Sequence, residues 1–333
     1  MKKIAVFFVF MVYSCSPPKN WVKNRNMGNA FGTTYSITYL TASTVDFQKE
    51  IDSVINVVNQ SMSTYMSDSD ISRINEGNST VIVDDMFKEV FAISSEVYTT
   101  SKGYFDPTIG ILADAWGFGP GEQIKLDSVK VDSLLNYVGW DKVTLREDGT
   151  IKKQDPEIRF DFNAVAKGYA IDRLGAMLAT KGVSNYLVEV GGEVLAKGTN
   201  TLKQKPWAVG IDSPNNLLKR GTAAIINLKD KALASSGNYR KFRFDEETGE
   251  KYVHTINPLT GFTKNSKVLA ASVIADDCAT ADAYATAFMA MDLEDSISLL
   301  QKSPHLQAYI IYLDEDDTLQ TYLTDGFQKL LVK

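Results

Sequence analysis

The chain has 333 residues, of which 44% are hydrophobic and 23% are charged, and its formal net charge at pH 7 is −6. That composition allows a full hydrophobic core in one large domain or two. The positive charges are interspersed with negative ones and form no basic cluster, which argues against nucleic-acid binding. We find no internal repeat and no low-complexity tract.

The N-terminus is predicted to be a targeting segment. Two lysines precede an apolar run, Ile4–Tyr13, that is too short to cross a bilayer as a helix. The run continues into V-Y-S-C and so resembles a bacterial lipobox, in which Cys15 is the lipidated first residue of the mature protein. The alternative is an ordinary signal peptide with an incidental cysteine. We expect an exported protein, lipid-anchored to a bacterial membrane and facing the periplasm. The predicted division is a signal peptide at 1–14, a tether at 15–26 and a folded domain at 27–333.

The other cysteine of the chain is Cys278. If Cys15 carries lipid, no disulfide can form within the chain, and stability must come from the core. Cys278 precedes an alanine-rich stretch and is interpreted as a small buried residue rather than a nucleophile.

The first half of the chain mixes helical and strand patterns. A β-branched, alternating run predicts a strand, and apolar residues at helical spacing predict the helices that follow. In chain order we expect a strand at 32–40, a helix after Thr44, a helix at 85–102 that stops at Gly103, a helix at 129–138, and strands at 142–145 and 158–162 joined through the Asp148-Gly149 turn.

The second half is richer in strands. A helix opens in the segment 161–180, and later strands follow without regular βαβ alternation, so the predicted fold is α+β with a mixed, largely antiparallel sheet. No G-x-G-x-x-G follows a strand, so a Rossmann site is not expected. The predicted strands are 186–190, 207–212, 222–228, 232–235, 239–244, 252–256, 268–275 and 307–313, with helices at 279–291 and 293–301.

The helix predicted at 279–291, A-T-A-D-A-Y-A-T-A-F-M-A-M, carries a carboxylate and a hydroxyl four residues apart, Asp282 and Thr286. Two oxygens on one face of a small, apolar helix suit a hard cation such as Mg²⁺. The alternative is local, because a helical Thr often bonds back to the preceding turn and an Asp often caps a helix.

Two further polar positions are candidates for phosphate chemistry. Lys167 lies near a helix N-terminus, six residues after Asp161, where a phosphate is better accommodated than a lone cation. The alternative for this lysine is a solvated side chain. His254 begins H-T-I-N-P-L-T-G, and alone it is more often a surface or core histidine than a catalyst.

Taken together, eight stretches resemble the FAD:protein FMN transferase (ApbE) family in the family's order. They are G-N-A-F-G-T-T-Y-S-I-T-Y, M-S-T-Y-M-S-D-S-D-I-S-R-I-N, G-Y-F-D-P-T-I-G, D-F-N-A-V-A-K-G-Y-A-I-D, V-G-G-E, S-S-G-N-Y, H-T-I-N-P-L-T-G and A-T-A-D-A-Y-A-T-A. The resemblance implies a T-fold-like architecture. It also implies Mg²⁺-dependent transfer of FMN from FAD to a Thr or Ser hydroxyl of an acceptor protein, such as a membrane redox-complex subunit, with AMP leaving.

The resemblance also implies roles for single residues. Asp282, Thr286 and the main-chain oxygen of Ala164 match the metal ligands, and Asp282 and His254 are the expected catalytic residues. Phe31 stands where many members have Met against the flavin ring, and either residue can contact that ring. The other expected FAD contacts are Tyr65, Tyr104, Phe105, Asp106, Asp161, Lys167 and Ile256.

Two alternatives to flavin transfer stay open from the sequence. The first is a Mg²⁺-dependent FAD pyrophosphatase, in which water replaces the acceptor hydroxyl and the products are FMN and AMP. The second is a non-catalytic exported lipoprotein that binds flavin or another solute. Such a binder needs neither the Asp282–Thr286 spacing nor a histidine beside the phosphate.

Overall fold

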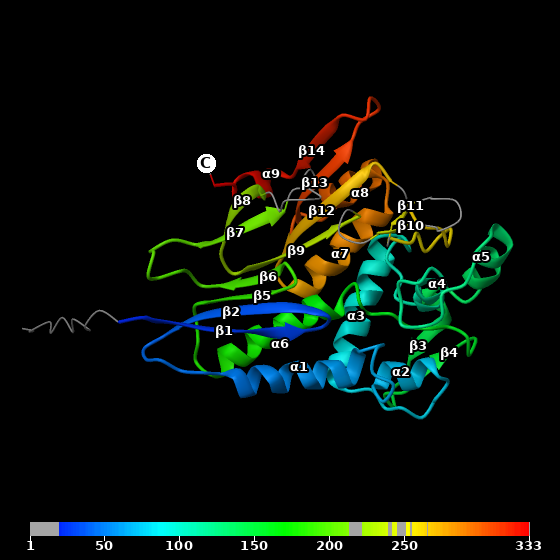
Figure 1. Cartoon of the computed structure of the whole chain (residues 1–333), viewed down its shortest axis with the longest axis horizontal. Coiled ribbons are helices and arrows are strands. Elements are labelled where there is room, and N and C mark those ends of the chain that lie inside the picture. The colour runs from blue at the N-terminus through cyan, green and yellow to red at the C-terminus, as the bar shows by residue number, and fades with distance from the viewer. Residues whose placement is uncertain are drawn as a thin grey trace, which may run out of the picture.

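The computed structural model describes residues 20–212, 222–238, 242–244, 251–253, 255–264 and 266–332. Its centre is an eight-stranded sheet in the order β1-β2-β5-β6-β9-β12-β13-β14, in which every neighbouring pair is antiparallel (Figure 1). These strands are β1 (Val22–Ala30), β2 (Thr33–Thr41), β5 (Tyr186–Val190), β6 (Glu193–Lys197), β9 (Lys231–Gly237), β12 (Val268–Ala275), β13 (Gln307–Leu313) and β14 (Leu319–Leu323). The predicted α+β class with a largely antiparallel sheet is confirmed.

The helices gather mainly on one face of this sheet (Figure 1). Along β2, Tyr35, Ile37 and Tyr39 alternate toward that face and form a buried cluster with residues of the long helices. The helices are α1 (Gln48–Met62), α2 (Asp70–Asn75), α3 (Asp85–Thr100), α4 (Gly110–Ala115), α5 (Ser128–Leu135), the 3₁₀ turn Trp140–Lys142, α6 (Ala166–Thr180), α7 (Cys278–Ala290), α8 (Leu293–Lys302) and α9 (Asp325–Gln328).

The opposite face of the sheet is covered by a β-hairpin. Trp207 and Ile226 from this hairpin form a second buried cluster with Val194 of β6 and Phe327 of α9. The central strands β12 and β13 are therefore buried on both faces and are correspondingly apolar, whereas the edge strands β1 and β14 are partly exposed. The hairpin is β7 (Trp207–Asp212) with β8 (Thr222–Leu228), and the smaller pairs are β3 (Val143–Leu145) with β4 (Ile151–Lys153) and β10 (Phe242–Phe244) with β11 (Lys251–Val253).

Helix α7 is almost entirely buried, because it packs against β9, β12, α3 and α6. It is apolar on all sides, as expected of a core helix. Asp277 caps its N-terminus through Thr280 N at 2.7 Å, and Asp172 of α6 accepts hydrogen bonds from the N–H groups of Cys278 and Ala279. Cys278 is buried as predicted, and burial raises the pKa of its thiol well above the usual value.

The structure differs from the sequence predictions in several places. The elements β1, β6, β14, α2, α4 and α9 were not predicted, and the segment 158–162 was assigned differently. The segment 158–162 was predicted as a strand, but the partner of β3 is β4, and Arg159 forms only an isolated bridge with Ile109. The apolar alternation of Ile158, Phe160 and Phe162 instead places three side chains in the core from an irregular segment. The first strand starts at Val22, within the predicted tether, because β1 pairs along the whole of β2. Within the described ranges, no helix is both long and apolar enough to cross a membrane.

Candidate active site

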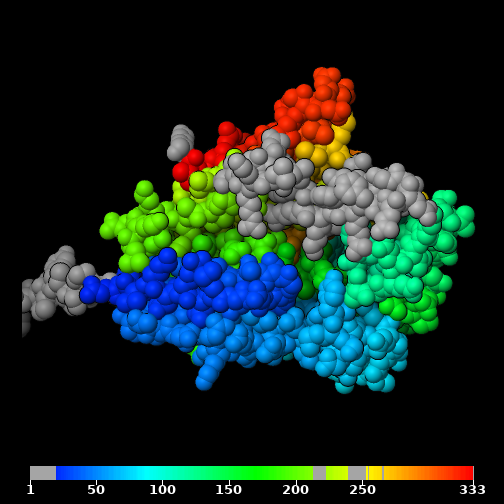
Figure 2. Space-filling model, viewed as in Figure 1, coloured from blue at the N-terminus to red at the C-terminus, as the bar shows by residue number. Residues whose placement is uncertain are grey.

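A cavity of about 780 Å³ opens where the ends of the central strands meet α6, α7 and the loops around α2 and α4. It brings together every described residue that the sequence predicted to contact flavin or metal. Figure 2 shows the blue β1–β2 hairpin ending beside the segments that carry the other walls. The predicted residues in its lining are Phe31, Tyr65, Tyr104, Phe105, Asp106, Asp161, Ala164, Lys167, Ile256, Asp282 and Thr286. The predicted base His254 and the predicted lipidation site Cys15 lie outside the described residues.

One wall is made by the tips of two adjacent hairpins. Phe31 and Gly32 connect β1 to β2 as a two-residue turn, and both have positive φ values, 52° and 73°. A positive φ at both positions suits the right-handed twist of the flanking strands. The neighbouring hairpin turns at Gly191 and Gly192, and Gly191 N donates to Thr34 O at 3.0 Å. The two turns are therefore held side by side at one end of the sheet, and they bring Phe31 and Glu193 to the same side of the cavity.

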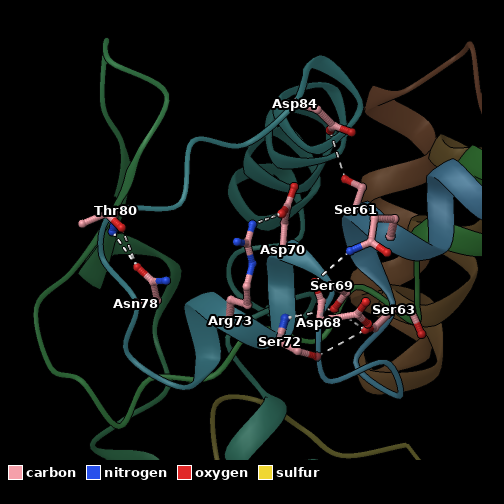
Figure 3. Close-up of polar contacts among 11 residues, drawn as sticks. Ser61, Ser63, Asp68, Ser69, Asp70, Ser72, Arg73, Asn78, Thr80 and Asp84 are labelled. Carbon is pink, nitrogen blue, oxygen red and sulfur yellow. Dashed lines mark hydrogen bonds and ion pairs between the residues drawn. The ribbon is translucent and has the colours of Figure 1, made fainter.

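A second wall is the serine-rich segment between α1 and α2. Ser69 Oγ donates to Ser63 O at 2.7 Å, and Ser72 N donates to Ser69 Oγ at 3.2 Å, which caps α2. Figure 3 shows these contacts converging on one tight loop. The loop presents Tyr65, whose side chain is 65% exposed at the cavity rim. Partial burial raises the pKa of Tyr65, and the negative charges of Asp161 and Asp114 add to this.

A third wall is the Gly103–Gly110 loop. The Asp106 carboxylate accepts hydrogen bonds from Thr108 N at 2.8 Å, Thr108 Oγ1 at 2.6 Å and Trp140 N at 3.0 Å. Burial raises the pKa of Asp106, although these three bonds oppose the change. Its carboxylate thus shapes the loop, and a flavin contact by Asp106 stays a prediction. Phe105 is 3% exposed and belongs to the core.

The charged part of the cavity centres on Asp282, which is 4% exposed. Its Oδ2 accepts a hydrogen bond from Gly168 N at 3.0 Å, and one turn further along α7 the Thr286 hydroxyl lies 3.4 Å from Ser236 Oγ. Burial raises the pKa of Asp282 to about 7, because the nearby Lys167 charge only partly offsets that burial, and Glu193 raises it further. The raised pKa shows that the ionised Asp282 carboxylate lacks enough positive charge nearby. A metal cation bound beside it would supply that charge and would itself be stabilised by the carboxylate.

Glu193 is a site residue for which the sequence predicted no role. Its side chain is 3% exposed and Oε2 lies 2.8 Å from Lys167 Nζ. Burial alone would lower the pKa of Lys167, but the charges of Asp282 and Glu193 outweigh it, and the net pKa is raised. Lys167 is therefore a charged ammonium in the cavity wall. The available signal was V-G-G-E, in which a glutamate directly follows a tight turn.

The oxygen atoms that line the charged part of the cavity can be compared with the ligands that a metal ion needs. In the part of the chain that the structure describes, no three His, Cys, Asp or Glu side chains form a metal-binding cluster. One buried carboxylate, one hydroxyl and one carbonyl, from Asp282, Thr286 and Ala164, line the same cavity. This oxygen-only set fits Mg²⁺, which binds proteins through few carboxylates and completes its shell with water and phosphate oxygens.

Comparisons with known proteins identify the family of this chain. The sequence model of the ApbE family matches residues 31–310. A Haemophilus influenzae protein named FAD:protein FMN transferase is 32% identical over 91% of this chain and 90% of its own length. A Vibrio cholerae protein of the same name is 32% identical over 99% of this chain and 98% of its own length.

Solved structures give the same result. The flavin transferase ApbE from Vibrio cholerae superposes with a TM-score of 0.83 at 30% identity and covers 94% of this chain and 100% of that one. The apo flavinyl transferase ApbE from Pseudomonas stutzeri gives a TM-score of 0.81 at 27% identity, over 93% of this chain and 97% of that one. The chain described here belongs to the ApbE family.

Proposed function

We propose that this chain transfers FMN from FAD to a Thr or Ser hydroxyl of an acceptor protein, with Mg²⁺ bound and AMP as the leaving group. The observation that carries the proposal is a cavity that combines aromatic side chains with a half-buried ammonium and an oxygen donor set. Aromatic rings favour an isoalloxazine, and the charged groups favour a pyrophosphate. The activity named for the relatives joins these two parts in one substrate.

The reaction is balanced without a redox step. The acceptor oxygen forms a bond to the FMN phosphorus, the phosphoanhydride bond breaks, and AMP leaves with the bonding electrons. The hydroxyl proton goes to a base, for which His254 remains the candidate. Lys167 donates to phosphate oxygens and places positive charge where negative charge develops. When bound, Mg²⁺ would neutralise the pyrophosphate and hold its oxygens against Asp282, Thr286 and Ala164.

The loop after residue 254 supports a protein acceptor. Ile256 and Pro258 line the cavity, while Leu259 and Phe262 are 49% and 40% exposed beside it. Gly261 has a φ of 74°, and its carbonyl accepts a hydrogen bond from Trp116 Nε1 at 2.9 Å, so the turn is held in place. Exposed apolar side chains at the rim of a charged cavity suit a docking polypeptide better than water alone.

The decisive test is to incubate the chain with FAD, Mg²⁺ and a candidate acceptor and to measure the acceptor's mass. We expect an increase equal to FMN less one water, together with AMP. AMP release that is equal with and without acceptor, and with no covalent flavin, would show a pyrophosphatase. FAD binding with neither product would show a binding protein.

The same assay includes a metal-ligand variant. Asp282→Asn should lower transfer by about a hundredfold or more, because the variant removes the one carboxylate of the donor set. FAD binding by fluorescence quenching and the thermal unfolding midpoint should change little. Asp277→Asn is the matched control, since Asp277 caps the same helix without lining the cavity.

We also propose export and lipid anchoring through Cys15, which the lipobox-like V-Y-S-C supports. Cys15→Ala should move the protein from the membrane fraction to the soluble fraction or block its processing. A variant that stays membrane-bound and is cleaved at the same place would exclude this assignment.

A further inference from the structure

We propose that Glu193 is the positioning residue of Lys167: it holds the ammonium in an ion pair and so keeps Asp282 free for the metal. This inference rests on the proposed function and adds a role that the sequence did not indicate. The three charged side chains are Lys167, Glu193 and Asp282, which line one cavity.

The first observation is the choice of partner. Lys167 lies near two buried carboxylates that carry opposite charge to its own, yet its ion pair is with Glu193 at 2.8 Å. The Lys167 ammonium is the partner that the structure gives to Glu193 Oε2, which is otherwise buried. Asp282 instead accepts a backbone hydrogen bond from Gly168. Among the described residues, the carboxylate that forms an ion pair with Lys167 is therefore Glu193 and not the predicted metal ligand, although the charge of Asp282 also acts on this lysine.

The second observation is that the backbone of Glu193 is fixed. Glu193 pairs with Val190 across a turn of two glycines with φ values of 64° and 107°. Gly192 N donates to Glu189 Oε1 at 2.9 Å, and a Cβ on Gly191 would lie 2.8 Å from the Thr33 side chain. Such a turn fixes the position of the residue that follows it, so the carboxylate is an anchored counter-charge.

The third step is the charge balance. An ammonium has three donors, so a lysine anchored by one of them to Glu193 still has two for phosphate oxygens. If the Glu193 charge is removed, Asp282 becomes the remaining buried carboxylate near Lys167. The ammonium would then pair with Asp282 and compete with Mg²⁺ for it. Glu193 therefore acts on the metal through the lysine.

The test measures Mg²⁺ affinity without FAD, by isothermal titration calorimetry, alongside steady-state transfer kinetics. Glu193→Gln should weaken Mg²⁺ binding about tenfold or more, as expected for groups that support a metal ligand. kcat should fall by a similar factor at fixed Mg²⁺, while KM for FAD changes by less than about threefold, because two donors remain for phosphate. Excess Mg²⁺ should restore part of kcat.

The decisive arm is the double variant. Lys167→Met removes the competing ammonium, so Glu193→Gln combined with Lys167→Met should bind Mg²⁺ at least as tightly as Lys167→Met alone. Glu193→Asp keeps the charge on a shorter side chain and should lie between wild type and Glu193→Gln. Glu50→Gln, which removes a carboxylate paired with Lys181 outside the cavity lining, is the matched control and should keep wild-type Mg²⁺ affinity.

Two results would overturn the inference. If Glu193→Gln keeps wild-type Mg²⁺ affinity and kcat, Glu193 does not position Lys167 for metal binding. If its Mg²⁺ defect persists in the Lys167→Met background, Glu193 acts on the metal directly or through the fold, and circular dichroism with thermal unfolding separates those causes. Failure of the proposed function is a different outcome, because the wild-type chain itself would then transfer no FMN.

Discussion

Phe31 shows how a single residue can carry backbone strain for the sake of a site. A φ of 52° is unfavourable for a bulky side chain, and such conformations typically cost about 1–3 kcal/mol. An Asn-Gly turn would form the same hairpin with less strain. The aromatic ring nevertheless lies in the cavity lining, where the resemblance places a flavin contact. We interpret the strain as a consequence of placing that ring.

Phe31→Asn should relieve the backbone strain and weaken the substrate complex. Because Phe31 also packs against two buried apolar clusters, we expect the relieved strain and the lost contacts to offset each other, and the free energy of unfolding in urea to change by less than about 1 kcal/mol. FAD affinity, measured by flavin fluorescence, should fall about tenfold because ring stacking is lost. Asp317→Gly is the control, since Asp317 also has a positive φ, 56°, but lies outside the cavity. If Phe31→Asn binds FAD with wild-type affinity, the flavin ring does not stack on Phe31.

Asp172 gives the stability a pH dependence. Burial raises its pKa from the ordinary 3.8 to about 7, against the hydrogen bonds from Cys278 and Ala279, and the charges of Asp277 and Asp282 add to the rise. The folded state thus holds this proton more tightly than the unfolded state. The contribution of Asp172 to stability should be highest below about pH 4, decline as the pH rises toward 7, and level off above it.

Asp172→Asn should make this decline shallower, because one of the groups responsible for it is removed. Urea unfolding at a series of pH values from 4 to about 8 measures the effect. Asp46→Asn should leave the decline in place, because the hydrogen bond from Asn26 lowers the pKa of Asp46 instead of raising it. If the stability of Asp172→Asn declines with pH as steeply as that of the wild type, other titratable groups cause the decline.

At the scale of elements, the helix α7 and its partner α6 set the geometry of the charged groups. Gly168 lies where the helices cross, and a Cβ there would meet Cys278 O at 2.3 Å and Ala279 Cα at 2.9 Å. The close approach lets Gly168 N reach Asp282, beside Lys167 in the first turn of α6. The small residues around Asp282 therefore allow the two backbones to approach each other closely.

Gly168→Ala should force the two helices apart. We expect a loss of about 1–3 kcal/mol in the free energy of unfolding, as for other overpacked core positions. Transfer should fall more than that loss explains at a temperature where the variant is fully folded, since Asp282 and Lys167 move relative to each other. Gly182→Ala is the matched control, because Gly182 has a φ of 76° beyond the end of α6, and a Cβ added there would meet no described atom within 4 Å. It should lose stability but keep kcat.

The sequence predicted the regular elements well where the pattern was periodic. β5, β7, β8, β12 and β13 were predicted with the boundaries that the structure has. The prediction was wrong at 158–162, because alternating Ile and Phe residues also fit an irregular segment that crosses the core. It missed the whole of β1, because V-K-N-R-N at its start is polar. Buried Asn24 and Asn26 in this strand bond to Thr41 and Asp46, and no periodicity shows such bonds.

For the whole molecule, the site was predictable because motifs far apart in the chain resembled one family, and the fold brings them to one cavity. Glu193 was missed because its role depends on a neighbour 26 positions earlier in the chain, Lys167, that only the fold places beside it. The surface proposed to dock the acceptor protein also depends on the whole fold, because loops from distant parts of the chain meet around the cavity mouth. Trp116 after α4 packs against Phe262 with ring centroids 6.5 Å apart.

The last prediction separates transfer from hydrolysis at this surface. Both reactions share the metal, the lysine and the leaving group, and they differ in whether a protein hydroxyl or water reaches the phosphorus. A docked hydroxyl reacts at an effective concentration far above its bulk value, so a surface that docks the acceptor favours transfer. Leu259 and Phe262 are the exposed apolar residues beside the cavity-lining part of the 255–264 loop.

Leu259→Ser combined with Phe262→Ser should lower kcat/KM for the acceptor about tenfold, because a single anchoring side chain at an interface centre is worth more than about 1 kcal/mol and not every contact residue is an anchor. FAD affinity and the slow AMP release without acceptor should stay within about twofold of wild type. Ile82→Ser is the control, since Ile82 is 69% exposed but lies outside the cavity lining. Loss of acceptor-independent AMP release together with transfer would mean that these side chains support the active site itself and not the docking of a partner.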